Sequence, residues 1–228
     1  MKVLSCMMFA FLLSAGASLT QGQLNRIVEK IRNEYRIDGQ FCLAAVFPPG
    51  LDPNTDVFKN DRFQAVSPVI GESSSDNNLR GVYASQRLIV ARPTLPVNGR
   101  SGEHAERRVL QALRNQLKSQ NIQGSDLLIY SFASACDTCT SDNHPSSITG
   151  DLRHIVQTYP NTVFVFKKVF QPRNSPPLPE NTLRDSLRSL GRAIGGLGKI
   201  FRCDPKCYSC AVQNEVSQYC IDNNAQPQ

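Results

Sequence analysis

Three side chains in the sequence have the types and spacing of a zinc site: His104, Cys136 and Cys139. One imidazole and two thiolates supply three protein ligands, which leaves the fourth tetrahedral position of a zinc ion open for water, as a catalytic site requires. Glu106 lies two residues after His104. A carboxylate that is not itself a ligand can take a proton from activated water and return it to a leaving group. Together these residue types are typical of hydrolytic deamination.

The pair His104 and Glu106 requires a particular helix start. Residues two apart on a regular helix point roughly 200° from each other, so the pair can act together only if the helix begins at His104. Glu103 and Glu106 then fall in the first turn, where the helix dipole favours acidic side chains. An apolar stripe follows at helical spacing, formed by Ala105, Val109, Ala112, Leu113 and Leu117. The pattern predicts a helix from His104 to about Ser119.

The two cysteines follow a segment that is typical of a buried strand. Residues 127–132 are mostly apolar, and such a run indicates a strand covered on both faces. Cys136 and Cys139 are therefore expected where a strand ends and a helix begins, close to backbone N–H groups that favour thiolates. A Cys-x-x-Cys pair alone is also compatible with a disulfide or a redox pair.

The order of strand, helix beginning with His-Ala-Glu, strand and Cys-x-x-Cys resembles the zinc-dependent cytidine deaminase superfamily. The resemblance covers residues 24–200 in element order and implies an α/β fold, a three-layer α/β/α sandwich with a mixed central sheet. It also implies that His104, Cys136 and Cys139 bind Zn2+ and that Glu106 is the catalytic general acid and base. Ala135 stands where the family usually has the proline of Pro-Cys-x-x-Cys.

The remaining elements alternate along the chain, which predicts a sheet layered between helices. Apolar periodicity predicts further helices at 24–35, 151–158 and 183–194, and further strands at 41–47, 87–91 and 162–170. Residues 51–84 are rich in Asn, Asp, Ser and Pro, and we interpret them as a long excursion between two strands.

The first 22 residues predict a secretory signal peptide. Lys2 precedes an apolar run at residues 3–13 and then small residues, and the run is too short to span a bilayer. Cleavage after Ala17 and cleavage after Gly22 both fit. No later stretch is apolar enough for a membrane anchor, so we expect a secreted protein with a deaminase-like domain at 23–200 and a cysteine-rich tail at 201–228.

The sequence contains 8 cysteines, and their use follows from an oxidising compartment. Four of them crowd the C-terminal tail: Cys203, Cys207, Cys210 and Cys220. We expect these to form two disulfides, for which three connectivities are possible. Cys42 lies within an apolar run and is interpreted as a small buried thiol.

The formal net charge of +6 favours phosphates or an anionic surface as partners, although a mild excess spread over a chain is usually solvated surface. The outer face of the His104 helix carries Arg107, Arg108, Arg114 and Lys118. We interpret it as a solvated face rather than a nucleic-acid contact. The resemblance to the cytidine deaminase superfamily implies a nucleobase as substrate, cytosine in preference to adenine, in single-stranded nucleic acid or a nucleoside.

A hypothesis from a different class is a non-catalytic secreted interaction protein on the same scaffold. Thiolate zinc sites compete with disulfide formation outside the cell. In this alternative Cys136 and Cys139 are oxidised to each other and His104 is left without a metal.

Overall fold

The structure is a computed structural model and describes residues 19–37, 39–47, 58–71, 81–95, 102–117, 126–172 and 175–227. Within these residues a seven-stranded sheet has the order β2-β3-β1-β4-β5-β6-β7. The strands are β1 (Cys42–Phe47), β2 (Val82–Ala84), β3 (Leu88–Ala91), β4 (Asp126–Ala133), β5 (Thr162–Lys168), β6 (Ile200–Cys203) and β7 (Cys207–Ser209). β1 pairs antiparallel with β3 and β4, whereas β4, β5 and β6 run parallel. The sheet is therefore mixed, as the sequence predicts.

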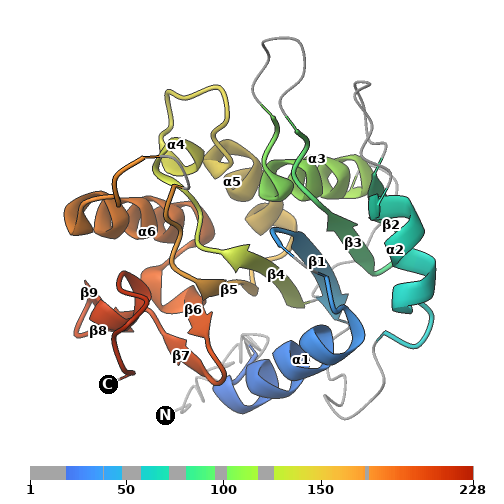
Figure 1. The fold of residues 1–228 in the computed structure, drawn as a ribbon, viewed down its shortest axis with the longest axis horizontal. Coiled ribbons are helices and arrows are strands. Elements are labelled where there is room, and N and C mark those ends of the chain that lie inside the picture. The colour runs from blue at the N-terminus through green and yellow to red at the C-terminus, as the bar shows by residue number, and fades with distance from the viewer. Residues whose placement is uncertain are drawn as a thin grey trace, which may run out of the picture.

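Helices cover both faces of the sheet (Figure 1). They are α1 (Gln21–Glu34), α2 (Phe63–Gly71), α3 (Ala105–Leu117), α4 (Asp137–Thr140), α5 (Thr149–Thr158) and α6 (Glu180–Ile194). α1 and α2 pack on one face, and α3, α5 and α6 pack on the other. Among the described helices, none has the length and apolar character needed to cross a membrane.

Alternate strand residues feed the two cores, because successive side chains of a strand point to opposite faces. Leu127 and Ile129 of β4 join the core under α3, α5 and α6, whereas Leu128 and Tyr130 join the core under α1. All four side chains are buried. This continuous apolar character on both faces confirms the three-layer α/β/α sandwich.

Two elements occur where the sequence indicated only an excursion between strands. Residues 63–71 form α2, which buries Val66 and Ile70 against the α1 side of the sheet. Residues 82–84 form β2 at the edge of the sheet. The spacing of Val66 and Ile70 is helical, but Pro68 lies inside the helix and proline is normally a sign of a break.

The C-terminal cysteines pair as two disulfides, Cys203 with Cys207 and Cys210 with Cys220. The predicted number of bonds is thus confirmed. The first disulfide joins β6 to β7, which pair antiparallel at the edge of the main sheet. Cys42 is buried and makes no disulfide, as expected.

Arg202 on β6 ties the end of the chain to the sheet. Its side chain is buried, and Nη1 donates to the carbonyl oxygens of Tyr219 and Asp222 at 2.5 and 2.7 Å. Nε donates to the carbonyl of Lys167 at 3.2 Å, and the guanidinium lies 4.5 Å from the centre of the Tyr219 ring. One side chain therefore joins β5, β6 and the last turn.

We predict that Arg202→Met lowers the free energy of unfolding by at least about 2 kcal/mol, because it leaves buried carbonyl groups without a donor. Urea denaturation with the disulfides intact measures this change. The matched control is Arg188→Met, since Arg188 is exposed and pairs only with surface carboxylates, and it should leave the midpoint unchanged. Equal effects of the two substitutions would show that the Arg202 network adds nothing to stability.

The beginning of α1 gives an expectation for signal cleavage. Thr20 and Gln23 form a capping box, Leu19 packs against the α1 side of the core, and Gln21 Nε2 donates to the carbonyl of Cys207 at 2.6 Å. Cleavage after Gly22 removes the cap and this contact, whereas cleavage after Ala17 keeps both. We therefore predict that the exported protein begins at Ser18. Its intact mass decides the matter, and a chain beginning at Gln23 would contradict the prediction.

Candidate active site

His104 lies immediately before α3, where the sequence required it. Its carbonyl accepts from the N–H of Arg108 at 3.2 Å, so His104 is the capping residue rather than part of the regular helix. The approach to the helix is fixed by two hydrogen bonds between Glu103 and Thr94: Glu103 N donates to Thr94 Oγ1 at 2.7 Å, and Thr94 N donates to Glu103 O at 2.9 Å. A Cβ at Gly102 would collide with the carbonyl of Thr94, so this position needs glycine.

Cys136 and Cys139 lie in the turn that follows β4. Cys136 caps α4, and its Sγ accepts from the backbone N–H of Cys139 at 3.1 Å. Both side chains are buried. The two Sγ atoms lie 3.9 and 3.4 Å from His104 Nδ1. The fold therefore brings together the three residues that the sequence predicted as metal ligands.

The ligand atoms of His104, Cys136 and Cys139 lie within 4.8 Å of one another, and their chemistry fits zinc. Zinc bond lengths at a tetrahedral angle place an imidazole nitrogen roughly 3.6 Å from a thiolate sulfur, and the observed distances of 3.4 and 3.9 Å lie on either side of this value. The two Sγ atoms are joined as a disulfide. A zinc ion requires the thiolates instead, so the disulfide and the metal-bound state exclude each other.

Glu106 is buried on the first turn of α3, with a side chain that is 2% exposed. Its Oε1 accepts from Gln40 Nε2 at 2.9 Å and from Ser131 Oγ at 2.5 Å. Its Oε2 is buried and has no hydrogen-bond partner within the described part of the chain. Because nearly all buried polar atoms are hydrogen-bonded, this oxygen fits a partner from outside the chain, such as a water molecule or a substrate.

Gln40 and Ser131 are site residues that the sequence analysis did not identify. Ser131 carried a signal, since it is a polar residue inside the apolar run 127–132. Gln40 carried none. Cys42, opposite Ser131 on β1, borders the same carboxylate, and burial, followed by the negative charge of Glu106, raises the pKa of its thiol well above the ordinary value. Cys42 is therefore a neutral thiol beside the site.

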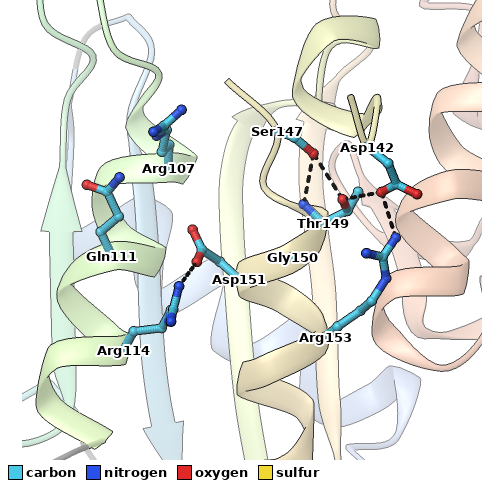
Figure 2. A pocket seen from close by; sticks show the side chains of 9 residues that line it. All are labelled: Arg107, Gln111, Arg114, Asp142, Ser147, Thr149, Gly150, Asp151 and Arg153. Carbon is cyan, nitrogen blue, oxygen red and sulfur yellow. Dashed lines mark hydrogen bonds and ion pairs between the residues drawn. The ribbon is translucent and has the colours of Figure 1, made fainter. Parts of the chain in front are cut away.

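A polar groove of about 530 Å³ lies between α3 and α5 (Figure 2). Its charged lining residues are Arg107, Arg114, Arg153, Asp142 and Asp151. Arg114 pairs with Asp151, and Arg153 pairs with Asp142 at 2.6 Å. These contacts cross between the histidine-bearing helix, the turn after Cys139 and α5.

The arginines of α3 depart in part from the solvated face that the sequence suggested. Arg107 pairs with Glu103 at 3.1 Å and donates to the carbonyl of Pro145. Arg108 is buried, and its Nη1 donates to the carbonyl of Arg92 at 2.6 Å, so the expectation of a solvated side chain is wrong there. Periodicity predicts which face of a helix a residue occupies, but not whether another segment of the chain covers that residue. Lys118 lies outside the described residues.

The chain matches the model of a protein family over most of its length. The family model described as Secreted Novel AID/APOBEC-like Deaminase 1 matches residues 21–224, whereas no curated protein matches the chain. The match covers the whole sandwich, the His104 and cysteine motifs and most of the disulfide-bonded tail. The chain therefore belongs to this family of secreted AID/APOBEC-like deaminases, within the cytidine deaminase-like superfamily.

Proposed function

We propose that this protein is a secreted, zinc-dependent deaminase that hydrolyses the exocyclic amine of a nucleobase, cytosine in preference to adenine. The observation that carries the proposal is the buried carboxylate of Glu106. Its Oε2 lacks a partner among the described residues. Glu106 also lies two residues after His104, whose Nδ1 faces the sulfur atoms of Cys136 and Cys139. A structural carboxylate would use both oxygens.

The roles of the side chains follow from this arrangement. His104 through Nδ1, Cys136 and Cys139 would hold the zinc ion. A bound zinc ion lowers the pKa of a water ligand toward neutrality and so supplies the nucleophile. Glu106 would take one proton of the water at Oε2 and give it to the ring nitrogen, and would then take the second proton and give it to the departing amine, while the water oxygen forms the new bond to the ring carbon. Water is consumed, the C–N bond breaks, and ammonia leaves.

The zinc and carboxylate roles predict two measurable properties. The exported protein should contain one zinc per chain and release ammonia from a cytosine substrate. Glu106→Gln should keep the metal and the fold but lower the rate by roughly a hundredfold to ten-thousandfold, because it removes the proton carrier. The measurements are metal content by mass spectrometry and ammonia release from cytidine and from single-stranded DNA and RNA.

The matched control for Glu106→Gln is Glu103→Gln. Glu103 lies on the same approach to α3, but its partly exposed side chain pairs with Arg107 and not with a residue of the candidate site, so this variant should keep wild-type activity. Substoichiometric zinc in the wild-type protein, or activity that survives Glu106→Gln, contradicts the proposed mechanism.

The second candidate function is a non-catalytic secreted interaction protein on the deaminase scaffold. The observation that favours it is the bond between Cys136 and Cys139, because a disulfide offers no thiolate to a metal. Mapping of free thiols and disulfides on the exported protein separates the two functions. A native Cys136–Cys139 bond throughout the sample would reject the zinc enzyme and favour the non-catalytic function.

For the substrate we propose single-stranded nucleic acid rather than a free nucleoside. The groove between α3 and α5 carries three arginines against two aspartates, and Arg192 is close enough to add to the lowering of the pKa of Asp142, after Thr149 and Arg153. The local charge is therefore positive. The ion pair of Arg153 with Asp142 is exposed, and exposed ion pairs contribute little stability. A phosphate group can therefore replace Asp142 as the partner of Arg153.

We predict that a cytosine-containing oligonucleotide binds with an affinity that falls steeply with salt, and that Arg153→Gln flattens the slope of log K against log salt by about 0.7, the loss of one phosphate contact. Fluorescence anisotropy over a salt series measures the slope. Arg188→Gln is the matched control, because Arg188 is also an exposed arginine paired with carboxylates. Binding that does not respond to salt would favour a free nucleoside as substrate.

A further inference from the structure

We propose that Ser131 and Gln40 are positioning residues for Glu106, which hold one carboxylate oxygen so that the other is presented to the reacting groups. The inference rests on the proposed deaminase function and extends it to two residues outside the His-Ala-Glu and Cys-x-x-Cys motifs. Three elements carry the network: the segment before β1, the middle of β4, and the first turn of α3.

Ser131 is a polar interruption of an apolar strand face. Leu127 and Ile129 precede it on the same face of β4 and belong to the core under α3. Ser131 is completely buried, and a buried hydroxyl is costly unless it is hydrogen-bonded. Its Oγ donates to Glu106 Oε1 at 2.5 Å. A serine at this depth is therefore explained by the carboxylate above it.

Gln40 reaches the same oxygen from the segment before β1. It follows Gly39, whose φ of +82° is in the left-handed region that glycine adopts readily. Gln40 Nε2 donates to Glu106 Oε1 at 2.9 Å and to Ser131 Oγ at 3.3 Å. The amide nitrogen has two hydrogens, so it can make both bonds at once.

The directions of these bonds are mutually consistent. Ser131 Oγ accepts from Gln40 and can therefore give its own proton to Glu106. Both donors act on Oε1, whereas Oε2 has no partner within the described residues. Because a carboxylate is planar, fixing Oε1 also fixes the direction of Oε2. Proton transfer depends on such placement, since a displacement of about 1 Å can lower a rate by about a hundredfold.

The first test separates positioning from general stability. Ser131→Ala and Gln40→Met remove the donors while approximately keeping shape, and each should lower kcat by about tenfold to a hundredfold with KM and zinc content unchanged. Ser186→Ala is the matched control, because Ser186 is also a buried serine with a hydrogen bond, to the carbonyl of Thr182 at 2.9 Å. If Ser131→Ala has the kcat of Ser186→Ala, the inference is overturned.

Two further measurements address a purely structural role. In a Glu106→Gln background, Ser131→Ala should cause no further loss of activity, because positioning acts only through Glu106. In the cobalt-substituted protein, Ser131→Ala and Glu106→Gln should both shift the visible d–d bands, whereas Ser186→Ala should not, since hydrogen bonding beyond the ligands tunes a metal site.

The outcomes distinguish this inference from the function on which it rests. A protein that binds neither zinc nor cobalt and releases no ammonia overturns both. The positioning role alone is overturned by a different result. In that case the protein binds cobalt and loses activity on Glu106→Gln, but Ser131→Ala and Gln40→Met change neither its spectrum nor its kcat.

Discussion

The burial of the Glu106 carboxylate is the constraint on which the centre of this protein depends. An ionised group inside a protein carries a desolvation penalty of several kcal/mol unless donors compensate it. The compensation comes from Gln40, just before β1, and from Ser131 in β4. These two strands are antiparallel neighbours in the register that places Cys42 opposite Ser131. A shift of that register by one residue would turn Ser131 to the other face of the sheet. The sheet pairing and the carboxylate thus specify each other.

The candidate metal ligands are held by a second set of constraints. His104 comes from the start of α3 and the cysteines from the turn after β4, so their meeting depends on how α3 sits against the segment that leads to α5. The close contact of Gly102 with Thr94 fixes where α3 begins. Arg107 joins the first turn of α3 to the carbonyl of Pro145, and Arg114 joins α3 to Asp151 of α5 (Figure 2). Polar contacts outside the site therefore align the two motifs.

Much of this arrangement was predictable from the sequence, because it depends on local patterns. The run 127–132 gave β4, the stripe from Ala105 to Leu117 gave α3, and the required position of His104 at the helix start followed from helical geometry. The unpredicted parts depend on tertiary contacts. α2 was not predicted, because Pro68 indicates a break in a helix. The connectivity of four cysteines has no local signature in the sequence. The contact of Gln40 with Glu106 depends on the pairing of β1 with β4. Ser131 lies between these cases, since its polarity was visible but its partner was not.

The turn that carries Cys136 and Cys139 can hold them as a disulfide or as two thiolates. The balance between these two states depends on zinc binding. The tail disulfides close short segments, with sequence separations of 4 and 10, so their cysteines find partners at little entropic cost. Cys136 and Cys139 are closer still, with a separation of 3, and local proximity alone therefore favours oxidation.

Zinc binds only the thiolate form, and its binding stabilises that form by RT ln(1 + [L]/Kd). The N–H of Cys139, which donates to Cys136 Sγ, favours the same form because it stabilises a thiolate. If the exported chain binds zinc as it folds, the metal therefore protects Cys136 and Cys139 from the oxidation that forms the two disulfides of the tail.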